Sequence, residues 1–407
     1  MQRRGAEVVF VIEESFKGTL QAKGFTEELM RLKPKPLVAE APGQFWKDFI
    51  RDTAPEFRKS TFEQIDTLIK PIWRELIDGS IFVNDRLKAI FETVKPDVIV
   101  QDNVVAFPAV LTAGVPWVRI VSCNPLEIAD PALPPALSGL PSSESADWER
   151  FRQAYVAAHA DLHDDFNRFA VEQGCPRLPA VEFMYESPFL NLYTYPDEID
   201  YGRSRPLAQT WHRLQSCVRS TDAPFELPPS LAGPGKVIYL SLGSLGSADT
   251  DLMTRLIDVL GETSHHVIVS MGPQHEVLQL HDNMVGAEFL PQTSILPLVD
   301  LVITHGGNNT VTESLHFGKP MIVLPLFWDQ HDNAQRVQEI GLGVRLDPYR
   351  LRGEELLGWV DRLLADRGLA VRLQGLASRL QATPGTVQAA EMIEAVARRG
   401  SPVPGRS

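Results

Sequence analysis

The sequence predicts an α/β protein made of two doubly wound domains, each a parallel sheet covered by helices. Three observations lead to this prediction. The chain has 407 residues, more than one hydrophobic core usually accommodates. Its C-terminal half alternates short apolar runs with segments that have helical spacing of apolar residues. Its N-terminal half holds three similar apolar runs. Such runs between amphipathic helices indicate buried parallel strands.

The C-terminal half gives the clearest elements. Apolar runs predict strands at 236–244, 266–272, 301–303, 320–326 and 343–347. Helical spacing predicts helices at 250–262, 294–300, 308–318 and 329–341. Strands and helices therefore alternate through a domain that we expect to span 236–385.

The N-terminal half is less regular. Strands are expected at 7–14, 97–102 and 117–123, with a long helical region at 61–94. The segment 124–148 is rich in proline, serine and alanine, and a long irregular segment in a compact domain is often functional. The predicted organisation is an N-terminal domain at 1–215, a Pro/Gly/Ser-rich interdomain linker at 216–235, the domain at 236–385, and a helix and tail at 386–407 that could pack back on the N-terminal domain.

Composition excludes several classes of protein. A formal net charge of -13 argues against a nucleic-acid partner. The cysteines Cys123, Cys175 and Cys217 form no CxxC pair, which favours the reducing cytoplasm and argues against a thiolate zinc site. Apolar runs are too short for an integral membrane segment. The sequence predicts no particular oligomeric state.

The stretch THGGNNTVTESLHFGKP, from 304 to 320, indicates a phosphate site. Glycines lie between an expected strand and an expected helix, where helix N-termini favour anions. His305 could give the phosphate a hydrogen bond or a positive charge. Asn309 or Thr310 could cap the helix, and Glu313 completes a capping-box pattern with Thr310. No Walker lysine motif is present. Alone, the stretch is equally compatible with a capped helix and a structural histidine.

Three other loops follow strands of the same domain. They are SLGS at 241–244, FLPQ at 289–292 and WDQHDNA at 328–334. The first is a second glycine turn, the second offers an aromatic face beside an amide, and the third pairs a carboxylate with an amide that suits sugar hydroxyls. Because loops after parallel strands meet at one edge of the sheet, these residues are expected to share one cleft.

The block from 289 to 335 resembles the nucleotide-sugar signature of the family 1 glycosyltransferases, the UDP-glycosyltransferase superfamily. The resemblance implies a GT-B fold of two facing Rossmann-like domains, with the donor on the C-terminal domain and the acceptor on the N-terminal domain. It implies which residues bind the nucleotide sugar. The base would contact Phe289 and Leu290, the ribose Gln292 and Glu313, and the sugar hydroxyls Asp329 and Gln330. The diphosphate would be held by Ser244, His305, Asn309 and Thr310, with Gly307 allowing its close approach and Asn308 acting through its backbone. The ribose role of Glu313 is preferred over the capping box.

The resemblance implies an inverting transfer of a hexose, probably glucose, from a UDP- or dTDP-sugar to a hydroxyl of an apolar small molecule. A histidine base would remove the hydroxyl proton, and Asp102 would orient that histidine. The helix N-terminus and His305 would stabilise the departing diphosphate, so we expect no metal and no cofactor.

The expected histidine is missing from its usual place, because the first histidine of the chain is His159. The start of the chain resembles the end of the family's first helix, so an N-terminal strand, loop and helix carrying the base are expected to be lacking. His159 and His163 are poor candidates to replace the base. Two alternatives remain open: a non-catalytic nucleotide-sugar-binding or auxiliary protein, and an epimerase acting on the nucleotide sugar.

Overall fold

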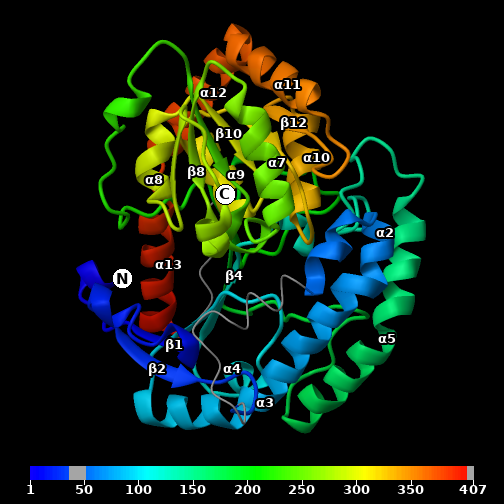
Figure 1. The fold of residues 1–407 in the computed structure, drawn as a ribbon. Coiled ribbons are helices and arrows are strands. Elements are labelled where there is room, and N and C mark those ends of the chain that lie inside the picture. Colours follow the sequence, from blue (N-terminus) through cyan, green and yellow to red (C-terminus); the bar gives the residue numbers. More distant parts are fainter. Residues whose placement is uncertain (36–51, 401–407) are drawn as a thin grey trace.

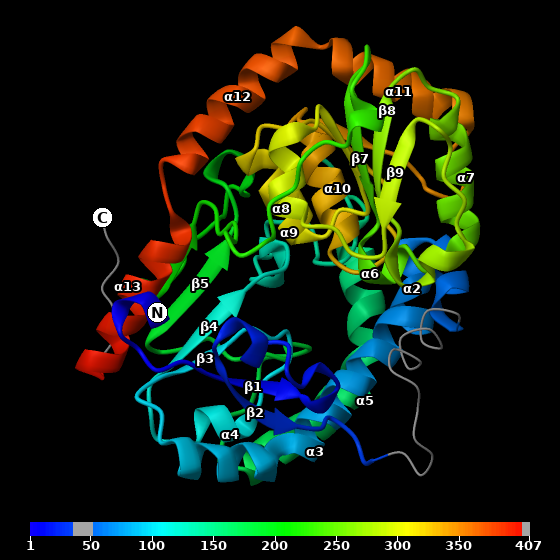
Figure 2. The same ribbon diagram turned by 60° about the vertical axis from the view of Figure 1, so that its left-hand side comes forward.

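The computed structural model describes residues 1–35 and 52–400 and contains two α/β domains that face each other (Figures 1 and 2). The predicted fold class is confirmed, since every strand pair in the described residues is parallel. No helix in these residues has the length and apolar character needed to cross a bilayer.

The C-terminal domain is built on a six-stranded sheet in the order β12-β11-β10-β7-β8-β9. This is the strand order of dinucleotide-binding Rossmann domains, with β7 and β10 flanking the point where the order reverses. The strands are β7 (Val237–Ser241), β8 (His266–Ser270), β9 (Met284–Ala287), β10 (Leu301–Thr304), β11 (Met321–Val323) and β12 (Gly343–Arg345). The helices are α6 (Gly243–Gly246), α7 (Thr250–Gly261), α8 (Gln292–Ile295), α9 (Asn308–His316), α10 (Gln330–Glu339), α11 (Gly353–Ala365) and α12 (Arg367–Gln381).

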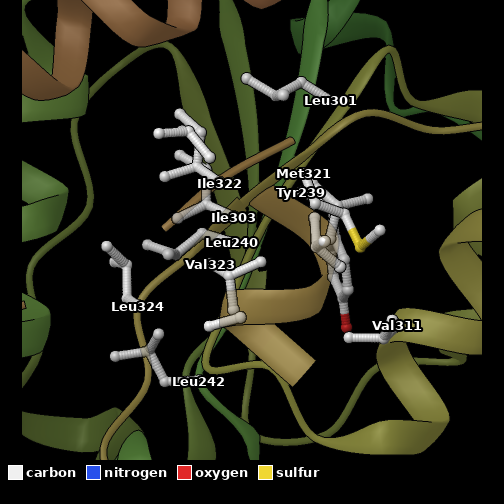
Figure 3. Packing of buried hydrophobic residues seen from close by; sticks show 14 of the residues in the cluster. Tyr239, Leu240, Leu242, Leu301, Ile303, Val311, Met321, Ile322, Val323 and Leu324 are labelled. Carbon is white, nitrogen blue, oxygen red and sulfur yellow. The ribbon is translucent and has the colours of Figure 1, made fainter. Parts of the chain in front are cut away.

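The core of this domain consists of the central strands and the helices on both faces of the sheet. Leu240, Ile303 and Ile322 come from three neighbouring strands, and all are 0% exposed. Their side chains lie together in Figure 3, whereas Val311 of α9 lies apart from them, near Tyr239. Burial on both faces explains why these strands are continuous apolar runs rather than alternating patterns.

The N-terminal domain contains two separate parallel sheets among its described residues. One has the order β3-β4-β5-β6, and the other pairs β1 with β2. The strands are β1 (Val9–Glu13), β2 (Thr26–Met30), β3 (Ile99–Gln101), β4 (Trp117–Val121), β5 (Leu190–Thr194) and β6 (Trp211–Leu214). The strands predicted at 7–14, 97–102 and 117–123 are therefore present, although the first lies in a different sheet from the other two.

Long helices cover the N-terminal sheets. The predicted helical region at 61–94 is confirmed as α2 (Thr61–Gln64), one π-helical turn (Ile65–Ile69) and α3 (Lys70–Val94). Short α4 (Pro108–Leu111) follows β3, and α5 (Trp148–Glu172) begins where the irregular segment 124–148 ends. The only helical turn inside 124–148 is Pro125–Glu127.

The last helix returns to the N-terminal domain. α13 (Gly385–Arg399) packs Ile393 and Val396 against Leu190, Leu192 and Leu214 of β5 and β6. Arg4 Nε donates to Glu394 Oε1 at 2.6 Å, which also joins the start of the chain to α13. In Figure 2 α13 runs beside β5, while α12 lies on the opposite domain.

Candidate functional site

The loops after β7 and β10 meet at the switch point of the C-terminal sheet. The two strands are neighbours in register, with Ser241 opposite Thr304. In an open parallel sheet a ligand binds beyond the carboxyl ends of such strands. Gly243 and Ser244 begin the short helix α6 after β7, and the loop after β10 carries His305 and leads into α9. The structure therefore brings these predicted residues to one place.

The ring of His305 lies between two glycines. A Cβ added at Gly243 would approach His305 Cε1 at 2.8 Å, and one added at Gly307 would approach Nε2 at 2.7 Å. Gly243 also has φ +69°, a conformation that favours glycine. The two glycine turns thus serve partly to leave space for the imidazole.

His305 is neutral at physiological pH. Burial lowers its pKa to about 4, and a hydrogen bond to the backbone of Ser241 opposes this only partly. Of the two roles considered for this histidine, the structure therefore favours hydrogen bonding over a permanent positive charge.

The N-terminus of α9 has no side-chain cap. Gly307 is its N-cap residue, and the first intrahelical bond runs from Val311 N to Gly307 O at 3.1 Å. The capping-box interpretation of Thr310 and Glu313 is wrong, because the helix begins at Asn308 and places Glu313 in its second turn. The amides of the first turn precede that first bond, as a site for an anion requires.

Glu313 instead accepts hydrogen bonds from other side chains. Gln292 Nε2 donates to Glu313 Oε2 at 2.6 Å and to Thr310 Oγ1 at 3.3 Å. Tyr239 donates from its hydroxyl to Gln292 Oε1 at 3.4 Å. Burial raises the pKa of Glu313, whereas Gln292 and Arg219 lower it. The pair predicted to bind ribose is thus assembled in the structure, one residue from α8 and one from α9.

Phe289 and Leu290 lie in the loop that leads from β9 to α8. Phe289 is 70% exposed, whereas Leu290 is half-buried against the core. Phe289 is the most exposed aromatic residue in the described parts of the chain, and three residues before Gln292 its ring offers a stacking face. Ser244 and Asn309 are also exposed, and Thr310 is buried.

Asp329 and Gln330 already have protein partners. Asp329 Oδ2 accepts from the Asn124 amide of the N-terminal domain at 2.8 Å and from Asn333 Nδ2 at 3.3 Å. Gln330 Oε1 accepts from the amides of Leu326 and Phe327 at 3.0 and 3.2 Å. Burial raises the pKa of Asp329 to about 6. Their predicted role toward sugar hydroxyls stays a prediction, and in this structure Asp329 holds the two domains together.

Two residues missed by sequence reasoning support this arrangement. Trp328, before Asp329, has φ +57°, which is unusual for a bulky side chain, and its ring lies 5.4 Å from that of Trp73 in α3. Asn124 donates from its side chain to Asn333 Oδ1 at 2.9 Å. Both residues face the domain boundary, where only a three-dimensional structure pairs them.

Asn308 has a role beyond the predicted backbone contact. Its Nδ2 donates to Ser122 O at 2.9 Å and to Thr194 O at 3.3 Å, at the ends of β4 and β5. The first residue of α9 therefore connects the anion-binding turn to the N-terminal domain.

Asp102 lines a cavity on the N-terminal side. The cavity has a volume of about 230 Å³, and its lining includes Leu76, Val104, Ile120, Ser122 and Glu127. Ser122 Oγ donates to Asp102 Oδ1 at 2.7 Å. The pKa of Asp102 is raised by desolvation, an effect that Ser122 opposes. A carboxylate on a partly apolar wall suits a small molecule that carries a hydroxyl.

No histidine is among the described residues that line this cavity. His159 and His163 lie on α5 and pack edge-on against Phe183. His159 Nδ1 lies 2.7 Å from Tyr155 O, and burial lowers the pKa of His159. Within the described parts of the chain, no group of three or more His, Cys, Asp or Glu residues is placed to hold a metal ion.

Comparison with known proteins agrees with this geometry. Residues 220–376 match the family model described as UDP-glucoronosyl and UDP-glucosyl transferase. NDP-glycosyltransferase YjiC of Bacillus subtilis is 30% identical over 168 residues, which are 40% of this chain and 43% of that protein. The oleandomycin glycosyltransferase of Streptomyces antibioticus is 25% identical over 77% of this chain and 73% of its own length.

Solved structures share the whole fold. The glycotransferase of kitacinnamycin superposes with a TM-score of 0.69 at 20% identity, covering 97% of this chain and 92% of that chain. Glycosyltransferase VinC in complex with dTDP gives a TM-score of 0.63 at 18% identity, covering 98% and 94%. The fold is therefore GT-B.

Residues 220–376 are therefore similar to the UDP-glucoronosyl and UDP-glucosyl transferases, and the named relatives support a glycosyltransferase ancestry. The alignments span only 41% and 43% of the first two curated relatives, YojK and YjiC of Bacillus subtilis.

Proposed function

We propose that this protein transfers a hexose such as glucose from a nucleotide sugar to a hydroxyl of an apolar small molecule, with inversion at the anomeric carbon. The single observation that carries the proposal is the Gln292–Glu313 pair, joined at 2.6 Å beside the uncapped N-terminus of α9. A diol-binding carboxylate next to an anion-binding helix end matches the ribose and diphosphate of a nucleotide.

The bound nucleotide sugar would extend from Phe289 to Asp329. Its base would stack on Phe289, its ribose hydroxyls would donate to Glu313, and its diphosphate would accept from the amides of α9 and from His305. The negative charge that develops on the departing diphosphate would be stabilised by the same groups, so the reaction needs no metal. UDP and dTDP are both compatible with these contacts.

The sugar would reach Asp329 and Gln330 only if their present contacts change. Asp329 bonds the Asn124 amide across the domain boundary, and it is 8% exposed. We propose that sugar binding replaces this bond by hydroxyl donors as the domains separate slightly. A hexose with its hydroxyls intact supplies such donors, which favours glucose over a deoxygenated sugar.

The acceptor would enter the cavity beside Asp102. The apolar wall of Leu76, Val104 and Ile120 suits a hydrophobic molecule, and the Asp102 carboxylate in the same lining would orient the catalytic base. A bound acceptor hydroxyl would pass its proton to that base as its oxygen forms the new bond to the anomeric carbon, and the bond from that carbon to the nucleoside diphosphate would break.

A second function is favoured by one observation. The described lining of the cavity has Asp102 and Glu127 but no histidine. A protein with this donor site and no base would bind nucleotide sugars without transferring them, as an auxiliary protein could.

The test separates donor binding from transfer. Calorimetry with UDP, dTDP and their glucose conjugates measures binding, and mass spectrometry of mixtures with hydroxylated terpenoids, polyphenols and macrolides detects products. Binding together with glucosylated product supports transfer. Binding with no product from any acceptor supports the second function, and no binding of either nucleotide contradicts both.

A further inference from the structure

We propose that Arg219, in the segment joining the two domains, is a positioning residue of the nucleotide site that aims the Glu313 carboxylate at the ribose hydroxyls. This inference rests on the proposed function, because it assumes a ribose beside Glu313. It adds a residue from outside the strand-end loops.

The guanidinium of Arg219 bridges two carboxylates. Its Nη1 donates to Glu313 Oε1 at 2.8 Å. Its Nε and Nη2 donate to Asp222 Oδ1 and Oδ2 at 2.8 and 3.0 Å. The second contact is the bidentate fork that fixes an arginine in one orientation. Asp222 therefore holds the guanidinium while its remaining edge faces Glu313.

Asp222 is itself anchored at the nucleotide site. Its Oδ2 accepts from the Thr293 amide at 3.0 Å and from Thr293 Oγ1 at 2.9 Å. Thr293 follows Gln292, which holds the other oxygen of Glu313. These residues form a closed ring of contacts that joins the interdomain segment, the start of α8 and the second turn of α9.

This ring of contacts leaves Glu313 able to accept hydrogen bonds from the ribose hydroxyls. Arg219 and Gln292 take one oxygen each, and an ionised carboxylate has about four lone-pair sites, so roughly two remain for the ribose hydroxyls. The Glu313 side chain is only 7% exposed, which disfavours its ionised form. A protonated Glu313 would donate a hydrogen bond to the ribose instead of accepting one. The positive charge of Arg219 favours the ionised carboxylate, which only accepts hydrogen bonds.

A surface ion pair would contribute little by itself. The Arg219 side chain is 45% exposed, and exposed pairs add little to stability. Its bidentate hold on Asp222 and its contact with a buried carboxylate therefore point to orientation of Glu313 as its main effect. Arg219 also retains donors for the nucleotide, because a guanidinium carries five N–H groups.

The experiment compares Arg219→Gln and Arg219→Lys with the wild type by calorimetry, using UDP and 2′-deoxy-UDP from pH 5.5 to 8.5. We expect Arg219→Gln to weaken UDP binding roughly tenfold. Binding of 2′-deoxy-UDP should weaken less, because this nucleotide lacks one of the two ribose hydroxyls that would donate to Glu313. The loss of affinity of Arg219→Gln on acidification should begin at higher pH than in the wild type. Arg219→Lys should restore the wild-type pH profile while recovering only part of the affinity.

Arg168→Gln is the matched control, since Arg168 pairs with Asp165 on the exposed surface of α5 in the N-terminal domain. It should change neither affinity nor pH profile. Failure of the wild type to bind UDP would contradict the proposed function itself. If the wild type binds UDP and Arg219→Gln leaves the UDP to 2′-deoxy-UDP ratio and the pH profile unchanged, the positioning role is wrong even if both affinities fall equally.

Discussion

Asn124 and Asp329 are 205 residues apart in the chain, yet the Asn124 amide donates a 2.8 Å hydrogen bond to Asp329 Oδ2. The bond joins the end of β4 in one domain to the start of α10 in the other. Three further residues reinforce it: Leu137 and Gly139 donate their amides to Asp332 at 2.6 and 2.8 Å, one turn along α10. The N-terminus of α10 therefore makes contacts between the domains. In an open sugar-binding site these side chains would instead be free to bind hydroxyls.

Asp329→Asn should change how stability depends on pH. The pKa of Asp329 is raised to about 6 and that of Asp332 to about 7, each mainly by burial. A carboxyl with a raised folded pKa contributes stability below its unfolded pKa, near 4, and this contribution is lost as pH rises through the folded pKa. Replacing Asp329 should therefore flatten the fall in the free energy of unfolding between about pH 4 and 6, by up to about 1.4 kcal/mol per pH unit.

Urea unfolding at several pH values measures this slope. Asp85→Asn is the control, because the Asp85 side chain is 95% exposed. An unchanged slope in Asp329→Asn would contradict the buried, proton-binding state assigned to Asp329.

Glu313→Ala should weaken UDP binding by roughly 1–3 kcal/mol, because Arg219 and Gln292 lose their shared partner and the ribose loses its acceptor. Calorimetry at pH 7.5 gives the difference, with the exposed Glu354→Ala as control. Equal affinities in Glu313→Ala and the wild type would remove the ribose assignment.

His305 should remain neutral in the free protein down to acidic pH. Burial lowers its pKa to about 4, so its ring proton resonances should not move between pH 5.5 and 8 in NMR spectra. A His305 midpoint near 6.5 would show that the ring is solvated rather than enclosed by its glycines.

Gly243→Ala should destabilise the C-terminal domain by roughly 1–3 kcal/mol and weaken UDP binding. The new Cβ would lie 2.8 Å from the His305 ring, and φ is +69°. Gly358→Ala is the opposite case, because Gly358 lies inside α11 with nothing within 4 Å of an added Cβ. It should stabilise the protein by about 0.5–1 kcal/mol. Equal melting temperatures for the two variants would contradict the close approach of Gly243 to His305.

Much of the C-terminal domain was predictable from sequence because its strands are buried on both faces. Val237–Ser241 is buried throughout, so it is apolar almost without interruption. By contrast, β2 (Thr26–Met30) contains two glutamates and is half-buried, and β6 (Trp211–Leu214) contains a histidine and an arginine. Neither was predicted, since partly exposed strands tolerate polar side chains and lose the apolar signal.

The candidate site was predictable where its residues follow strands in sequence, as Gln292 and Glu313 do. Contacts such as Arg219 with Glu313, separated by 94 residues, leave no periodic pattern. The capping box failed for a local reason: its spacing is present at Thr310, but the helix starts two residues earlier, at Asn308. A motif with the right spacing does not determine the residue at which a helix begins.

The return of α13 to the N-terminal sheet means that the backbone passes between the domains twice, once before β7 and once after α12 (Figure 1). Two neighbouring covalent tethers restrict the domains to bending about a common axis, whereas a single tether would also permit free swivelling. A protease that cuts only within 216–235 would therefore leave both domains attached, since the apolar face of α13 still holds the C-terminal fragment to β5 and β6.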